Sequence, residues 1–152
     1  MADLTISIKK SDVYEEVAKT TAYIGAKNKL EDGKSAFDQV FVTDADLAMI
    51  ERFYNESVDT LMNLLKRFVA ELNSENGNIN WKLSMSDRFD NNLGTSITRS
   101  ATSFLVNSII GKWCEITAPD KVKEYADNAA ALLTDIKDKV FHKSAPSRVK
   151  PT

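Results

Sequence analysis

Two stretches of the chain alternate apolar and polar residues with the period of two that is typical of a half-buried strand. One lies near residues 4–9 and the other near residues 79–85, and their apolar members are Leu4, Ile6, Ile8, Ile79, Trp81, Leu83 and Met85. Because a strand alone leaves its backbone groups unpaired, we expect these two to pair with each other. The pattern predicts a small β element of two, or three, strands.

Four other stretches repeat apolar residues at steps of three and four, which predicts helices. They run from about 11 to 27, from 43 to 72, from 90 to 116 and from 119 to 142. The second has the strongest periodicity, carried by Leu47, Ile50, Tyr54, Val58, Leu61, Leu65, Phe68 and Leu72. At 1.5 Å per residue, a helix of some thirty residues would be about 45 Å long and would cross the whole molecule.

The fold class predicted is mainly α: a four-helix bundle-like domain with one long helix and the small β element. We expect residues 1–142 to form a single helical domain and residues 143–152 a flexible basic tail. Asn76-Gly77 is the best turn signal in the chain. Phe37 and the run Val40 to Val42 predict a short extended segment, and Thr43 with Asp46 has the spacing of a helix capping box.

Composition argues against most kinds of catalysis. The 152 residues suffice for one domain with a substantial core, but they include only one cysteine and one histidine. This excludes a disulfide framework and multi-cysteine zinc sites, removes most metal-catalysis templates and weakens the case for a catalytic triad. We expect Cys114 to be buried, His142 to cap the last helix, and Asp44 and Asp46 to serve capping rather than cation binding. The prediction is a protein that is not an enzyme, with no metal and no cofactor.

Charge and hydropathy limit the setting. The chain has no secretory signal at its start and no apolar run near the 20 residues of a membrane span, so we expect no membrane association. A net charge of −2 gives no general attraction to nucleic acid. Basic residues are nevertheless concentrated at the C-terminus, where no acid accompanies His142, Lys143, Arg148 and Lys150.

The β element is the most suggestive interaction feature, because a two-stranded ribbon is marginal alone and a neighbouring subunit can complete it. Together with the large aromatic Trp81 and the basic residues near the tail, it gives a set of interaction candidates. They are Leu4, Ile6, Ile8, Trp81, Arg88, Lys143, Arg148 and Lys150.

Four segments carry a resemblance to a known group of proteins: VYEEVAKTTAYIGAK (13–27), FVTDADLAMIERFY (41–54), FLVNSIIGKW (104–113) and KVFHKSAPSRVKP (139–151). In these the chain resembles short proteins encoded among the virion-structural genes of bacteriophages and prophages. The resemblance implies a non-enzymatic head, neck or tail-completion protein, located in the virion or the host cytoplasm. Its partners would be other virion proteins or further copies of itself. The alternative is a small helical regulatory or nucleic-acid-binding module that uses the basic tail.

Overall fold

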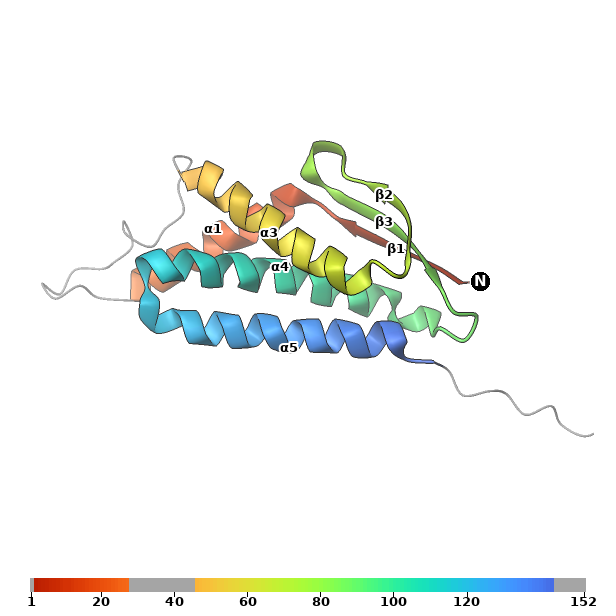
Figure 1. Ribbon diagram of the computed structural model, residues 1–152. Helices are drawn as coiled ribbons and strands as arrows, with labels where there is room; N and C mark the ends of the chain where they lie inside the picture. Colours follow the sequence, from red (N-terminus) through yellow and green to blue (C-terminus); the bar gives the residue numbers. More distant parts are fainter. Residues whose placement is uncertain (1, 28–45, 144–152) are drawn as a thin grey trace, which may run out of the picture.

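A computed structural model describes residues 2–27 and 46–143. The described residues are mainly helical, with four α-helices and a small three-stranded antiparallel sheet. In chain order the elements are β1 (Ala2–Ile8), α1 (Lys10–Lys27), α3 (Leu47–Leu65), β2 (Val69–Asn73), β3 (Ile79–Met85), α4 (Gly94–Thr117) and α5 (Val122–Phe141). Helix α4 is the central element, since it contacts α1, α3, α5 and β1. Figure 1 shows it lying between α5 and the layer that α3 and the sheet form.

The sheet has the order β1-β3-β2, with β3 in the middle. The predicted pairing of the two alternating segments is confirmed: β1 and β3 run antiparallel over seven residue pairs, with Ile6 opposite Trp81. The third strand, β2, pairs with the other side of β3, placing Leu72 opposite Trp81. The sheet is therefore a β2–β3 hairpin to which the N-terminal strand β1 is added on the other side of β3, so β1 and β2 are the two edge strands.

One face of the sheet packs against the helices and the other faces outward. Every second side chain of β1 and β3 is buried, while Thr5, Ser7, Asn80 and Lys82 between them are exposed. The buried strand residues join one continuous core with α1, α3, α4 and α5. Its largest fully buried members are Trp81, Tyr54, Ile6, Ile50, Leu61, Leu65, Ile79, Leu83, Met85, Ile97, Leu105 and Ile109.

The predicted long helix over residues 43–72 is wrong. Helix α3 begins at Leu47 and ends at Leu65, a length of about 28 Å, and Val69–Asn73 forms β2 instead. The chain turns where the N–H of Phe68 donates to the carbonyl of Leu65 (2.9 Å), and the Phe68 carbonyl accepts from the N–H of Ser84 (2.7 Å). After Leu65, hydrogen bonds to β3 therefore satisfy backbone N–H and C=O groups that would be bonded within the helix if α3 continued. The longest described helix is α4, with 24 residues.

The turn between β2 and β3 is built on the predicted Asn76-Gly77 pair, and both residues have positive φ (57° and 78°). Two helices hold this turn in place. The hydroxyl of Tyr54 on α3 donates to the Gly77 carbonyl (2.6 Å), and the N–H of Lys10 at the start of α1 donates to Oδ1 of Asn78 (2.9 Å). Burial raises the pKa of Tyr54 to about 12, so its hydroxyl stays protonated and able to donate.

The other helix ends lie near their predicted places. A short 3-10 turn at Asn91–Leu93 precedes α4, and Asp90 Oδ1 accepts from the N–H of Asn92 (3.0 Å). A second such turn at Pro119–Lys121 precedes α5, which ends at Phe141. Asp46 stands just before α3 but makes no capping hydrogen bond. Thr43, the segment 37–42 and the tail from residue 144 lie outside the described residues.

The turn yields a test of this geometry. Replacing Gly77 with Ala adds a Cβ that would lie 2.8 Å from Lys10 Cδ, at a φ that costs L residues about 1–2 kcal/mol. We expect Gly77→Ala to lower the free energy of unfolding by roughly that amount, measured by urea denaturation. Asn76→Gly, which relieves a positive φ one residue earlier, is the matched control and should leave stability within about 0.5 kcal/mol. Equal stability of the two variants would contradict the turn.

Candidate protein-binding groove

The interaction candidates divide into buried and exposed groups. The side chains of Leu4, Ile6, Ile8 and Trp81 are buried and face the helices, so in this fold they build the core rather than a contact surface. Arg88 and Lys143 are exposed and close together, because a backbone bridge joins Phe89 to Lys143. Arg148 and Lys150 lie outside the described residues. The apolar side chains of β1 therefore lie in the core, while the strand that carries them offers its backbone edge.

The backbone of β1 has a free edge. The N–H of Ser84 on β3 points toward β2, since it donates to Phe68. The directions of the backbone N–H and C=O groups alternate along an antiparallel strand. The backbone groups of the odd-numbered residues of β3 therefore point toward β1 and bond those of Leu4, Ile6 and Ile8 opposite them. The N–H and C=O groups of Asp3, Thr5 and Ser7 consequently point away from the sheet. No backbone hydrogen bond within the described residues occupies them.

The two edges of the sheet differ. Strand β2 has only five residues and an irregularity between Val69 and Glu71, features that discourage further pairing at an edge. Strand β1 pairs along its whole length in regular register, so its outer backbone groups are evenly spaced. A straight, regular edge is a template for another strand. The open edge suited to a partner is therefore that of β1.

Helix α4 runs alongside this edge. Its first residue, Gly94, is so close to β1 that an added Cβ would lie 3.1 Å from Leu4 Cδ1. A hollow of about 410 Å³ is lined by Leu4, Thr5 and Ser7 on one side and by Thr95, Thr98 and Arg99 on the other. A second, of about 320 Å³, lies between Ile8 and Thr102. From Gly94 to Thr102 the helix rises about 12 Å; from Leu4 to Ile8 the strand rises about 13 Å. We call this space the strand–helix groove, formed by β1 and by Thr95, Thr98, Arg99 and Thr102.

The helical wall of the groove is a stripe of threonines at helical spacing. The hydroxyl of Thr98 donates to the Gly94 carbonyl (3.2 Å) and that of Thr102 to the Thr98 carbonyl (2.9 Å). Because these hydroxyls bond the helix backbone, the methyl groups form the outer part of each side chain. The stripe continues past Thr102 to Val106, in a hollow of about 480 Å³ that also touches Glu16 of α1. The wall thus suits small apolar side chains.

Charge is divided along the groove. Arg99 is exposed on the helical wall, and within the described part of the chain it makes no ion pair of 4 Å or less. Asp12 and Glu16 of α1 line the hollows beyond Ser7. An extended peptide carrying an acidic residue near Arg99 would match this division.

Apart from the groove, a cluster of polar side chains joins α4 to α5. The hydroxyl of Ser100 donates to Asp135 Oδ2 (2.7 Å), and Nζ of Lys139 donates to both Asp135 (2.6 Å) and Ser100 (3.1 Å). These bonds hold the pKa of Asp135 below its usual value. Because Ser100 on α4 bonds both Asp135 and Lys139 on α5, the cluster is an interhelical link.

Cys114 and His142 are the two remaining residues that could take part in chemistry. Cys114 is fully buried, and burial raises its pKa to about 11, which keeps the thiol protonated near neutral pH. The backbone N–H of His142 donates to the Lys139 carbonyl at the end of α5. Within residues 2–27 and 46–143, no group of three potential metal-ligating side chains comes together. No helix in those ranges combines the length and hydropathy needed to cross a bilayer.

The free edge makes a prediction for amide hydrogen exchange. We expect the amides of Thr5 and Ser7 to exchange faster than those of Leu4, Ile6 and Ile8 by about tenfold or more, because only the latter are bonded to β3. Nuclear magnetic resonance of the isolated protein measures each amide. Uniform protection along β1 would contradict the free edge.

The interhelical cluster makes a prediction for pH. A lowered pKa stabilises the fold above the unfolded value, about 3.9, and this contribution is lost as pH falls through the folded value. Asp135→Asn should therefore destabilise the protein at neutral pH, and the difference from wild type should shrink in acid. Asp127→Asn breaks a more exposed pair with Lys123 on the same helix and should have no measurable effect. Urea unfolding at several pH values tests both; a difference that is constant with pH would contradict the assignment.

We compared the chain with known protein families, proteins and structures. The chain matches no protein-family model, and it shows no significant similarity to a curated protein or to a solved structure.

Proposed function

We propose that this protein is an assembly component that holds an extended segment of a partner chain in its strand–helix groove, by strand addition to β1. The single observation that carries the proposal is the free, regular edge of β1 beside the threonine stripe of α4. Outward backbone groups of Asp3, Thr5 and Ser7 would supply the hydrogen bonds. Alternate partner side chains would meet the methyl groups of Thr98 and Thr102.

The shape of the groove favours one added strand over a symmetric pair of β1 edges. Paired strands lie about 4.8 Å apart, whereas packed helices need about 8–10 Å between their axes. Because α4 lines the groove along the outer edge of β1, two copies joined edge to edge would bring their α4 helices too close. The partner strand should therefore come from a segment that has no helix beneath it, in another protein or in a second copy.

Strand addition of this size suits a multi-copy assembly. A partner strand paired along the seven residues of β1 buries much less surface than the roughly 1,600 Å² of a standard stable interface. Several copies bound at once raise the effective affinity without new contacts. The resemblance to phage and prophage virion-structural proteins supplies such a setting, so we propose a head, neck or tail-completion role for the chain, without enzymatic activity.

A photo-crosslinking residue at Thr5 tests the groove. The full chain would be expressed alone and together with the products of its neighbouring genes, and crosslinked peptides would be identified by mass spectrometry. We expect crosslinks to one extended segment of one partner or of a second copy. Thr98→Trp, which fills the groove, should abolish them.

Thr134 provides the matched control. It is an exposed threonine on α5 whose hydroxyl makes the same bond to the carbonyl four residues earlier. Thr134→Trp should leave the crosslinks from Thr5 unchanged. Crosslinks that survive Thr98→Trp, or that form equally well from a crosslinker at position 134, would refute strand addition.

Gene order tests the virion role separately. Portal, capsid or tail genes next to the gene for this chain would support a virion component, and a metabolic operon would overturn it. The groove proposal does not depend on that result, because it rests on the backbone geometry of β1.

A further inference from the structure

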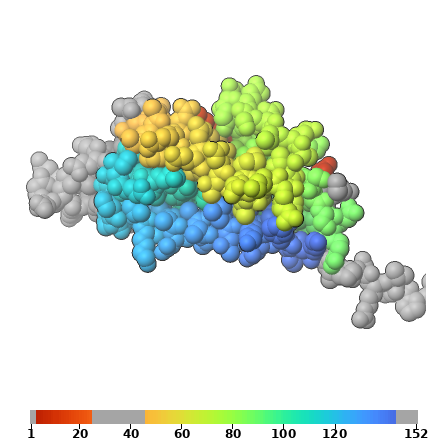
Figure 2. Space-filling model, viewed as in Figure 1, coloured from red at the N-terminus to blue at the C-terminus, as the bar shows by residue number. Residues whose placement is uncertain are grey.

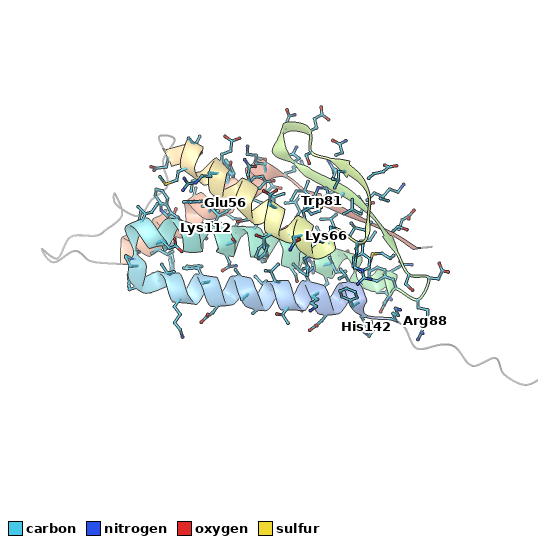
Figure 3. All side chains as sticks on the ribbon, viewed as in Figure 1. Glu56, Lys66, Trp81, Arg88, Lys112 and His142 are labelled. Atoms are coloured by element: carbon cyan, nitrogen blue, oxygen red, sulfur yellow. The ribbon has the colours of Figure 1, made fainter. Side chains whose placement is uncertain are left out.

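A second surface lies at the end of the molecule where three segments meet. Arg67 follows α3, Arg88 belongs to the connection between β3 and α4, and Lys143 follows α5; all three are exposed. The bridge from Phe89 to Lys143 brings the latter two segments together. Figure 2 shows the end of α5, the chain after α3 and the connection before α4 gathered at one end. Figure 3 places Arg88 beside His142 there.

An exposed aromatic ring lies among these cations. Phe141 is 42% exposed, and Arg67 Cζ lies 5.5 Å from its ring centroid. Phe68 supports the ring from the side, with centroids 5.3 Å apart and planes at 64°. Arg67 also lies 5.9 Å from the Phe68 ring. The contacts hold Phe141 in one orientation and leave much of its surface open. We call Arg67, Arg88, Phe141, His142 and Lys143 the basic end.

The charge of the basic end is local. The acids nearby in sequence are Asp87 and Asp90, on either side of Arg88, Glu71, four residues after Arg67, and Asp138, one helical turn before His142. From Lys139 to the last residue the sequence contains basic side chains but no acidic one, within a chain whose net charge is −2. Among the described residues, Arg67 lies over the exposed ring, and Lys143 follows Phe141 by two residues with no acid between them.

We propose that the basic end binds single-stranded nucleic acid. Arg67, Arg88 and Lys143 would contact backbone phosphates, and a base would stack on the open face of Phe141. Sites for single strands combine cations that follow the phosphates with aromatic rings that stack on bases. A duplex offers the phosphates but keeps its bases stacked inside, so it would use the cations alone. This site is independent of the strand–helix groove.

Fluorescence anisotropy tests the site, with the full chain and a labelled oligo(dT) or a duplex of equal length at low salt. We expect tighter binding to oligo(dT) than to the duplex, weakening as salt is added. Arg67→Glu combined with Lys143→Glu should weaken oligo(dT) binding about tenfold or more. Phe141→Ala should weaken it about tenfold, whereas Phe141→Trp should retain it. Thermal unfolding of each variant checks that it is folded.

Lys123→Glu is the matched control, because it reverses a fully exposed charge on the opposite end of α5. It should leave binding unchanged. Four outcomes would overturn the site: no binding of oligo(dT) at low salt; binding indifferent to the Arg67 and Lys143 changes; equal weakening by Lys123→Glu; or binding lost on deletion of residues 144–152 yet insensitive to these variants. Equal affinity for duplex with no effect of Phe141→Ala would overturn the single-strand preference.

Discussion

The whole arrangement depends on the central strand, β3, which is hydrogen-bonded on both sides while it buries every second side chain against the helices. Ile79, Trp81, Leu83 and Met85 all face inward. If β1 and β3 slipped by one residue against each other, the apolar side chains of one of the two strands would turn from the core toward solvent. Core packing therefore fixes the register. The same register decides which backbone groups of β1 remain outside. Core packing and the free edge are thus two results of a single constraint.

The sequence was sufficient to predict the pairing of β1 with β3 and the four helical regions, but not the end of α3. Leu65, Phe68 and Leu72 continue the helical spacing of the residues before them, although Leu72 is exposed on β2. Local periodicity carries no information about hydrogen bonds to a strand further along the chain, such as the bond from the N–H of Ser84 to the carbonyl of Phe68. The Asn76-Gly77 turn was the available signal, because a turn of this kind needs a strand on each side.

The groove was only partly accessible from the sequence. Alternation identified β1 and drew attention to its apolar residues, but an apolar set on a half-buried strand faces the core. The edge groups belong to the alternate residues, Thr5 and Ser7. The threonine stripe of α4 carries no signal by itself, because threonines on a helix surface are common. Its role comes from lying along β1, which is a property of packing between elements far apart in the chain.

The connection from β3 to α4, residues 86–93, positions both surfaces. Phe89 is buried and bridges to Lys143, which fixes the connection against the end of α5. Helix α4 then starts at Gly94, in close contact with Leu4 of β1. An added Cβ at Gly94 would lie 3.1 Å from Leu4 Cδ1, so either the Leu4 side chain or the start of α4 would have to shift by a few tenths of an ångström. The width of the groove and the grouping of cations at the basic end therefore depend on the same eight residues, even though the two surfaces would recognise different chemistry.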